Sequence, residues 1–287
     1  MKKIIAAHDL SGLGTASLGA VIPIISSMGS YVCSLPTAVL STITGVFEGY
    51  AITGLTEQMQ RTIQHWDGLG VTFDYIYSGF LGSAEQVDII LDAASRFHGC
   101  YLVVDPVFAD NGRLYPTMDG AMVENMKRLA ARANLITPNF TEARFLLGET
   151  PPEGVVDETR DFPEAEAKDW LTRLCGTGPE RAVITGGKFR DGMYVTAYDK
   201  PRGAFWKLKC EYVPAQFHGT GDIFTSVLVG ALARGDCFET AVALAARFVR
   251  TAIDATLAEQ WEPRMGVLVE KVLGGLGTPP AILCERF

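Results

Sequence analysis

Short apolar runs alternate with helical periodicity along most of the chain. Each run has the length and composition of a buried strand. We expect strands at residues 3–7, 31–35, 75–78, 101–104, 135–136 and 182–184. We expect helices at residues 16–28, 57–69, 83–97, 119–133, 141–147, 164–175, 241–257 and 266–273. Strands that alternate with helices are typical of a parallel sheet covered by helices on both faces.

Local signals refine this pattern. Pro23 predicts a kink in the first helix, and Ser83 is a favourable N-cap for the third. Residues 192–198 and 204–212 predict a β-hairpin. The polar, proline-rich segment 148–163 predicts a loop.

Composition narrows the class of protein. The 287 residues are 48% hydrophobic and 20% charged, as in an ordinary globular protein. Because no internal repeat or clear linker divides them, we expect residues 1–287 to form a single domain. The net charge is −8 without a cluster of Lys or Arg, which argues against nucleic acid or an anionic membrane as a partner.

Targeting signals and metal-binding spacings are missing from the sequence. The apolar stretch after Lys3 is too short for a signal peptide and no run reaches transmembrane length, so we expect a cytoplasmic protein. Six dispersed cysteines without a C-x-x-C pair favour buried, reduced thiols over disulfides or a zinc site. The four histidines also lack ligand spacing, and we expect His8 and His218 to be structural or peripheral.

The segment His218-Gly219-Thr220-Gly221-Asp222 opens directly into an apolar run at residues 223–229. Glycines let several amide N–H groups point at one place, and the start of a helix adds partial positive charge there, so the turn suits a phosphate. A carboxylate beside a phosphate is unfavourable for binding alone, but it suits a base that deprotonates an attacking hydroxyl. The alternative is that Asp222 only caps the helix, and the pentapeptide alone leaves both open.

Polar turns follow most of the predicted strands, at residues 8–12, 78–82, 105–110, 137–142 and 185–187. Ligands of open α/β sheets bind at the carboxyl ends of the strands, where these turns would converge. Each turn alone is typical of ordinary loop chemistry. Their joint position predicts an active site.

Two common nucleotide motifs do not account for this site. The chain has no G-x-x-x-x-G-K-[ST] sequence, which excludes a P-loop enzyme. Residues 12–17 only partly match the dinucleotide fingerprint, because Ser17 replaces its third glycine and no acidic residue ends the strand at 31–35. This argues against NAD binding.

Asp105, Asp110, Asn139 and Glu142 offer a set of oxygen ligands. Oxygens of this kind hold Mg²⁺, several of them through water, when the ion also binds nucleotide phosphates. The alternative is that Asp105 and Glu142 cap turns and pair with nearby Arg or Lys. The residues alone leave both interpretations open.

Several motifs together resemble a known family. Gly219-Thr220-Gly221-Asp222 resembles the G-T-G-D signature of the ribokinase superfamily. Residues 105–110 resemble the D-P-V-M-G-D segment of pyridoxal and hydroxymethylpyrimidine kinases, and residues 137–143 resemble their T-P-N-x-x-E-A. Residues 9–14 and 36–45 are most similar to vitamin B6 kinases. The resemblance to the pyridoxal kinase family runs from about Ile4 to Arg234 in the same order.

The resemblance implies a ribokinase-like three-layer α/β/α sandwich with a mainly parallel central sheet. It also implies ATP-dependent phosphorylation of the 5′-hydroxymethyl group of pyridoxal, pyridoxine or pyridoxamine, with Mg²⁺. Asp222 would be the base, and Gly219, Thr220 and Gly221 would hold the transferring phosphoryl group with backbone amides. The remaining roles concern metal and nucleotide: Asp105, Asp110, Asn139 and Glu142 would position Mg²⁺, Thr185 would contact a phosphate, and the segment 187–217, beginning at Gly187, would cover the nucleotide.

The same resemblance assigns the substrate side. Asp9 and Thr44 would face the polar atoms of the pyridine ring, with Leu40 and Phe80 against its faces. Phe80 stands where pyridoxal kinases often have Tyr, and Asp9 where some members have Ser and the pyrimidine kinases have Asp. Phe108 and Ala109 likewise replace Met and Gly of the family motif.

Two alternatives remain beside a B6 kinase. One is hydroxymethylpyrimidine kinase of thiamine synthesis or another small-alcohol kinase, and the other is a non-catalytic vitamin-binding protein of the same fold. The intact Asp222 argues against a pure binder. The resemblance further implies a homodimer and leaves a monovalent cation requirement open.

Overall fold

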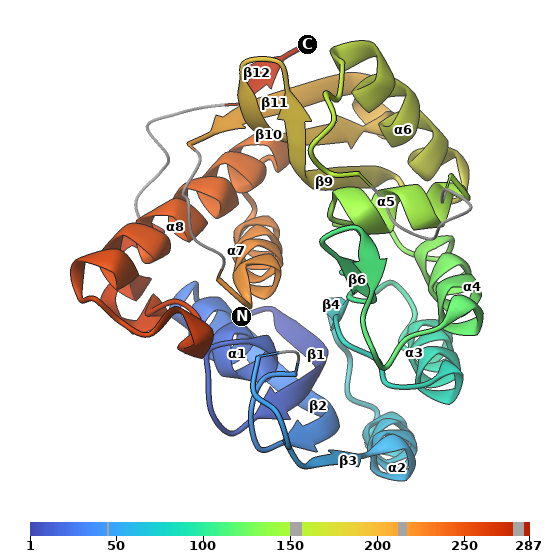
Figure 1. Ribbon diagram of the computed structural model, residues 1–287. Helices are drawn as coiled ribbons and strands as arrows, with labels where there is room; N and C mark the ends of the chain where they lie inside the picture. The colour runs from blue at the N-terminus through green and yellow to red at the C-terminus, as the bar shows by residue number, and fades with distance from the viewer. Residues whose placement is uncertain (45, 150–156, 212–216, 278–283) are drawn as a thin grey trace.

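A ten-stranded sheet runs through the middle of the molecule (Figure 1). The computed structural model describes residues 1–44, 46–149, 157–211, 217–277 and 284–287. In spatial order the strands are β12 (Glu285–Arg286), β11 (Ala204–Cys210), β10 (Gly192–Asp199), β9 (Arg181–Phe189), β8 (Leu135–Ile136), β5 (Tyr101–Val104), β4 (Tyr75–Ser78), β1 (Lys3–Ser11), β2 (Tyr31–Leu40) and β3 (Ile52–Gly54). Strands β9 to β2 of this order pair in parallel and the outer ones antiparallel, so the expected mainly parallel sheet is confirmed.

Helices cover both faces of the sheet, as Figure 1 shows. One layer consists of α1 (Ser17–Ser27), α7 (Thr220–Arg234) and α8 (Phe238–Ala258). The other consists of α2 (Thr56–Gly68), α3 (Ala84–Arg96), α4 (Gly120–Ala130), α5 (Phe140–Leu147) and α6 (Glu164–Gly176). Short 3₁₀ turns complete the described chain at η1 (Lys200–Arg202), η2 (Pro263–Met265), η3 (Val269–Lys271) and η4 (Leu273–Gly277). The expected three-layer α/β/α arrangement is therefore confirmed.

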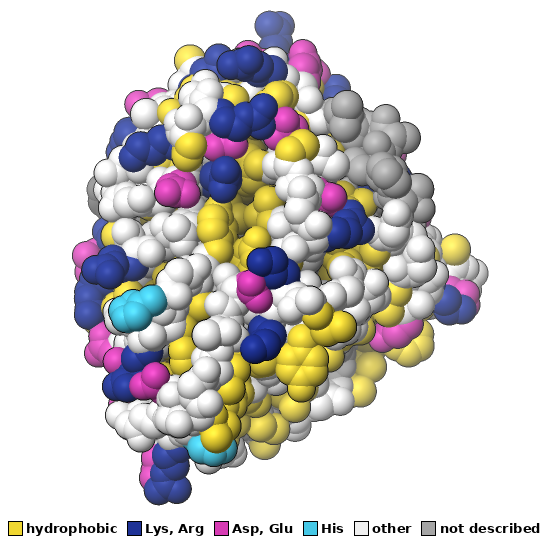
Figure 2. Space-filling model, turned by 180° about the vertical axis from the view of Figure 1, so that it is seen from behind, with side chains coloured by type: hydrophobic (Ala, Val, Ile, Leu, Met, Phe, Trp, Pro, Cys, Tyr) yellow, Lys and Arg dark blue, Asp and Glu magenta, His cyan; other side chains and the backbone are white. Residues whose placement is uncertain are grey.

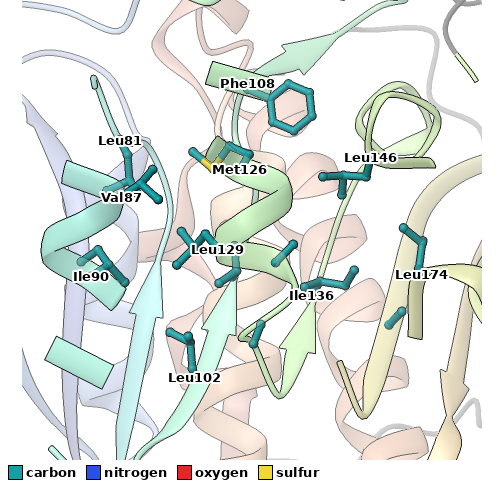
Figure 3. Close-up of a cluster of buried hydrophobic side chains, with 14 of the residues drawn as sticks. Leu81, Val87, Ile90, Leu102, Phe108, Met126, Leu129, Ile136, Leu146 and Leu174 are labelled. Atoms are coloured by element: carbon teal, nitrogen blue, oxygen red, sulfur yellow. The ribbon is translucent and has the colours of Figure 1, made fainter. Parts of the chain in front are cut away.

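The two-residue period of the strands sends alternate side chains into the two cores. In β1, Ile4 packs with the α1, α7 and α8 layer, whereas Ile5 packs with the opposite layer. Figure 3 shows the second core, in which Leu102 of β5 and Ile136 of β8 face Leu129 of α4. Each such side chain contributes about 1.5–3 kcal/mol through removal of apolar surface from water. Burial on both faces makes the carboxyl ends of the strands a rigid platform.

Aromatic packing fixes the start of α5. The ring centroid of Phe140, the first residue of α5, lies 5.0 Å from that of Trp170 in α6 and 5.1 Å from that of Phe162. Trp170 and Phe162 are almost completely buried. This cluster holds the helix end that carries the predicted residues Asn139 and Glu142.

Several boundaries differ from the sequence prediction. The strand expected at 31–35 continues to Leu40, and the short strands β3, β12 and the separate hairpin β6 (Ala109–Asp110) and β7 (Arg113–Leu114) were not predicted. The helix expected at 266–273 is wrong, because this glycine-containing segment forms only the 3₁₀ turns η3 and η4. Pro23 lies inside α1, and Ser83 caps α3 as expected by accepting a hydrogen bond from the Gln86 N–H.

Three expected features extend outside the described residues. They are Gly45 of the segment 36–45, residues 150–156 of the expected loop, and residues 212–216 of the expected nucleotide cover. Within the described part, β10 and β11 form the predicted hairpin.

The surface charges, the length of the helices and the state of the cysteines complete the description of the fold. On the face in Figure 2, Lys and Arg side chains lie among Asp and Glu side chains. Among the described residues, no helix combines the length and apolar character needed to cross a membrane. All six cysteines, each within the described ranges, are free thiols, but only Cys175 and Cys284 are buried, and Cys237 is exposed.

Candidate active site

The polar turns at the carboxyl ends of the central strands meet at one edge of the sheet. The Thr137 N–H donates to the Val104 carbonyl, and the Thr185 N–H donates to the Pro138 carbonyl. From the helical layer, the Thr225 hydroxyl of α7 donates to the Thr137 hydroxyl at 2.9 Å. A cavity of about 780 Å³ opens here, lined among others by Asp105, Asp110, Asn139, Glu142, Thr185 and residues 219–222. The predicted convergence is confirmed for the turns at 105–110, 137–142 and 185–187, whereas residues 8–12, most of which belong to β1, and residues 78–82 do not line this cavity.

The glycine turn before α7 has the predicted local geometry. Gly219 is the N-cap and has a φ of 80°, and a Cβ there would collide with the Thr15 carbonyl oxygen, so only glycine fits. The helix begins at Thr220, and the first N–H groups of a helix have no partner inside it. Gly219, Thr220 and Gly221 line the cavity, where their amides and the helix dipole favour an anion.

Asp222 is not the N-cap of α7. The N-cap is Gly219, and Asp222 is the third residue of the helix. Its Oδ2 accepts a 2.9 Å hydrogen bond from the Ser17 N–H at the start of α1. The alternative in which Asp222 serves as the cap is therefore wrong, and the carboxylate lies in the cavity lining.

Asp9 lies close to Asp222 through Ser17. The Ser17 hydroxyl donates to Asp9 Oδ1 at 2.5 Å, while the Ser11 hydroxyl donates to Oδ2 at 3.2 Å. Burial raises the pKa of Asp9, and the negative charge of Asp222 raises it further. Ser17, with a φ of 48°, holds both carboxylates at once. Apart from the place of Ser17 in a glycine-rich segment, nothing in the sequence indicated this role.

His8 was expected to be structural or peripheral, and it lies directly against Asp222. Its Nδ1 is 3.7 Å from Asp222 Oδ1, and its side chain is completely buried. The only sequence signal was its position next to Asp9 at the end of the first strand.

Glu142 and Asn139 cap α5 reciprocally. The Asn139 side chain accepts a bond from the Glu142 N–H, and Glu142 accepts one from the Asn139 N–H. Glu142 also accepts a 3.1 Å bond from the Phe108 N–H. Burial raises the pKa of Glu142 to about 8, although these N–H groups oppose the shift. The capping role considered for Glu142 is thus confirmed, while no ion pair with Arg or Lys involves it within the described residues.

Asp105 is the most isolated acid of the site. It is buried, and its Oδ2 has no hydrogen-bond partner among the described residues. Burial raises its pKa well above the usual value, and the nearby charges of Glu142 and Asp222 act in the same direction. A Cβ on Gly221 would lie 3.9 Å from Asp105 Oδ2, which brings this carboxylate next to the glycine turn. A buried carboxylate oxygen without a partner, beside other acids, favours a cation.

These residues fit a largely hydrated Mg²⁺ rather than a chelated metal. No group of three His, Cys, Asp or Glu side chains in the described ranges is arranged to hold a metal directly. Glu142 already accepts backbone hydrogen bonds, whereas Asp105 Oδ2 is free. Asp110 lies on β6, which the Asn139 side-chain amide joins by donating to the Ala109 carbonyl at 2.7 Å. Mg²⁺ commonly keeps several waters and binds one or two carboxylates together with phosphates.

The far end of the cavity is lined by the hairpin and by α8. Val195 of β10 and Leu208 of β11 line it, together with Ala243, Ala246 and Val249 of α8. The sequence predicted this helix and hairpin but not which of their faces would line a site. Thr185 and Gly186 also line the cavity, whereas Gly187 does not. A Cβ on Gly187 would lie 2.8 Å from Phe162, so this glycine packs toward the aromatic cluster instead.

The remaining predicted substrate residues lie outside the lining of the large cavity. Leu40 ends β2 and is buried, Thr44 is half-buried, and Phe80 belongs to the core on the α2–α6 side. The Phe80 carbonyl accepts a 2.9 Å hydrogen bond from the Thr37 hydroxyl, which ties this turn to β2. Among the described contacts, only Asp9 of the four substrate residues is joined to Asp222, through Ser17.

Comparison with known proteins gives consistent matches. The sequence profile of the phosphomethylpyrimidine kinase family matches residues 13–266. A Bacteroides thetaiotaomicron protein described as a phosphomethylpyrimidine kinase, in an orthorhombic crystal form with pyridoxal, is 42% identical with a TM-score of 0.93, over 100% of this chain and 99% of that one. Pyridoxal kinase from Lactobacillus plantarum is 28% identical with a TM-score of 0.87, over 96% of each chain. The fold is therefore ribokinase-like, as the sequence resemblance implied.

A longer relative extends the comparison to thiamine synthesis. The chloroplastic thiamine biosynthetic bifunctional enzyme of Arabidopsis thaliana is 29% identical over 248 residues, which are 85% of this chain. The chain spans only 45% of the length of that relative.

Proposed function

The chain belongs to the phosphomethylpyrimidine kinase family, and we propose that it transfers the terminal phosphoryl group of ATP to the 5′-hydroxymethyl group of pyridoxal, pyridoxine or pyridoxamine. The observation that carries the proposal is the position of Asp222. Its carboxylate lies in the first turn of α7, directly after the glycine turn and within the same cavity lining. A pure vitamin-binding protein has no need of a carboxylate there.

Asp222 acts as the base. One of its oxygens accepts a hydrogen bond from the Ser17 N–H, and the Ser17 hydroxyl bonds Asp9. It accepts the proton that leaves the substrate hydroxyl as the oxygen attacks phosphorus, and the bond from phosphorus to the bridging oxygen of ADP breaks.

The glycine turn stabilises the charge that develops on the transferring group. The amides of Gly219, Thr220 and Gly221 converge at a helix N-terminus and need no reorganisation during the reaction. The hairpin and α8 enclose the nucleotide, with Thr185 at a phosphate and the apolar pair Val195 and Leu208 toward the base. Exclusion of water from this end limits hydrolysis of ATP.

Asp105, Glu142, Asn139 and Asp110 would hold Mg²⁺, mostly through water. The ion, when bound, neutralises charge on the phosphates. The unpartnered Oδ2 of Asp105 supports this assignment.

On the substrate side, Asp9 pairs with a protonated ring nitrogen or an amine, with Thr44, Leu40 and Phe80 completing the ring site. The Bacteroides thetaiotaomicron structure with pyridoxal, 42% identical to this chain, supports a B6 vitamer as substrate. A second candidate, hydroxymethylpyrimidine or its phosphate, is favoured by the family description and by the thiamine-biosynthetic relative. We further propose that residues 1–287 act as one kinase domain, in a cytoplasmic homodimer.

ADP release measured side by side with pyridoxal, pyridoxine, pyridoxamine and hydroxymethylpyrimidine tests the proposal. A B6 vitamer should stimulate ADP formation well above the ATPase background and above hydroxymethylpyrimidine. Faster turnover of the pyrimidine would favour the second candidate, and no stimulation by any of them would contradict a kinase of this class.

Asp222→Asn tests the base. Removal of a general base costs about 10²–10⁴-fold in kcat. ATP affinity should change little, because the glycine turn remains. Retention of wild-type kcat in Asp222→Asn would exclude Asp222 as the base.

A further inference from the structure

His8 occupies an unusual position for a histidine. It lies in β1 and is completely buried, and its ring meets that of Tyr77 edge-on, with centroids 4.3 Å apart. Neither ring nitrogen has a hydrogen-bond partner among the described residues. A buried polar group without a partner carries a free-energy cost, so its placement in the core calls for an explanation.

The turn at Gly79 packs closely against the His8 imidazole. Gly79 follows β4, and a Cβ at this position would collide with His8 Nδ1 and Cε1. The Gly79 N–H donates to the Ala7 carbonyl at 2.9 Å, which keeps the backbone of this turn against β1. The ring therefore sits in a fixed slot between Tyr77 and the turn at Gly79.

In this position the His8 ring lies next to the carboxylate of Asp222. His8 Nδ1 lies 3.7 Å from Asp222 Oδ1, while Asp222 Oδ2 accepts its bond from the Ser17 N–H. Tyr77, which packs on the imidazole, also reaches the backbone of the same residue, because its hydroxyl donates to the Asp222 carbonyl at 3.4 Å. The two carboxylate oxygens thus face two different nitrogens, the Ser17 N–H on α1 and His8 Nδ1 on β1.

We propose that His8 is a positioning residue for Asp222: its imidazole donates from Nδ1 to Asp222 Oδ1 and fixes the carboxylate toward the attacking hydroxyl. This inference rests on the proposed function, because it requires Asp222 to be the base. The 3.7 Å separation is too long for a hydrogen bond in the ligand-free site. Catalytic hydrogen bonds are often long without substrate and shorten in the reacting complex.

The substitutions His8→Asn and His8→Gln distinguish a role of His8 in positioning Asp222 from a role in filling space in the core. The amide nitrogen of an Asn side chain can occupy the place of a histidine Nδ1, whereas that of Gln corresponds to Nε2. Gln is nearer in volume to His, so a purely structural role predicts that His8→Gln is tolerated better than His8→Asn. Donation from Nδ1 predicts the reverse order.

The experiment measures kcat and KM for ATP and for the vitamer in wild type, His8→Asn, His8→Gln and His8→Leu. We expect kcat to fall at least about 30-fold in His8→Leu and His8→Gln and less than about 5-fold in His8→Asn, with each KM within about 3-fold of wild type. His98→Asn is the matched control, because His98 is exposed on the loop after α3 and should leave both parameters unchanged. Tm and ATP binding are recorded for every variant.

The possible outcomes distinguish a failure of the His8 positioning role from a failure of the proposed kinase function. Absence of phosphorylation by the wild type with every substrate contradicts the proposed function and therefore removes the basis for His8 as well. An active wild type in which His8→Gln equals or exceeds His8→Asn in kcat overturns the positioning role alone. If His8→Asn does not fold, a His8→Leu variant that folds and keeps wild-type kcat overturns it equally, while one that folds, binds ATP and loses kcat supports it.

Discussion

The backbone N–H of Ser17 donates a 2.9 Å hydrogen bond to Oδ2 of Asp222 and so joins the first residue of α1 to the first turn of α7. The Ser17 hydroxyl donates to Asp9 at the same time. One residue therefore links two acids, of which we propose that one recognises the substrate and the other deprotonates it.

Ser17→Ala separates these two contacts, because it removes the hydroxyl and keeps the N–H. We expect KM for the vitamer to rise about 10-fold, since a hydrogen bond to a charged group contributes about 1.5–3 kcal/mol, while kcat changes less. Steady-state kinetics with a fixed, saturating ATP concentration gives both values. A fall in kcat with an unchanged KM would show that the hydroxyl serves Asp222 rather than Asp9.

Two left-handed glycines at opposite ends of α7 provide a matched pair. Gly219 has a φ of 80° and its Cβ would collide with Thr15, whereas Gly235 has a φ of 103° and open space around it. Gly235→Ala should cost only the strain of a left-handed residue, about 1–2 kcal/mol, and leave kcat unchanged. Gly219→Ala should lower the free energy of unfolding more than Gly235→Ala does. It should also abolish most phosphoryl transfer, because the new Cβ would push the glycine turn away from Thr15. Equal losses of stability with equal kcat in the two variants would contradict the proposed role of the turn.

The glycine turn and the convergence of strand ends could be predicted because both depend on short segments. Glycines at 219 and 221 next to an apolar run specify a turn and a helix start locally, and a parallel sheet brings the strand ends together. Contacts between distant segments could not be predicted in this way. The approach of His8 to Asp222 and the packing of Gly187 against Phe162 depend on how whole elements are placed. The failed helix at 266–273 shows that apolar residues alone do not determine helical structure where glycines let the chain turn.

Stability should depend on pH through Glu142. Burial raises its pKa in the folded protein from an ordinary value of 4.5 to about 8, so the folded state binds more protons than the unfolded state between these values. The contribution of Glu142 to stability is therefore fully present below about pH 4.5 and is lost as the pH rises toward 8. Unfolding by urea at pH 5, 6.5 and 8, in buffer with EDTA, should show a smaller decline for Glu142→Gln than for wild type. Gln keeps a side-chain acceptor at this capping position.

Glu124→Gln is the control for that series, because Glu124 is exposed on α4 and pairs with Lys127 on the surface. Its stability should follow the wild-type curve at each pH. A Glu142→Gln protein with the wild-type slope would show that burial of this carboxyl does not govern the pH dependence.

We expect Asp105 to favour Mg²⁺ binding and to lower the free energy of unfolding of the metal-free protein. Its Oδ2 is buried without a partner, and burial together with the charges of Glu142 and Asp222 raises its pKa. Asp105→Asn removes this unfavourable charge, so we expect the free energy of unfolding to rise by about 1–3 kcal/mol. Because the pKa of Asp105 is raised in the folded protein, its carboxyl destabilises the folded state more as the pH increases. The gain in unfolding free energy from Asp105→Asn should therefore be larger at pH 8.5 than at pH 6.

Asp105→Asn should also raise the Mg²⁺ concentration that gives half-maximal kcat at least about 10-fold, since one carboxylate of the ion's site is lost. Urea unfolding without metal and a Mg²⁺ titration of activity measure the two effects independently. Lower stability with an unchanged Mg²⁺ dependence would mean that Asp105 serves the fold and not the ion.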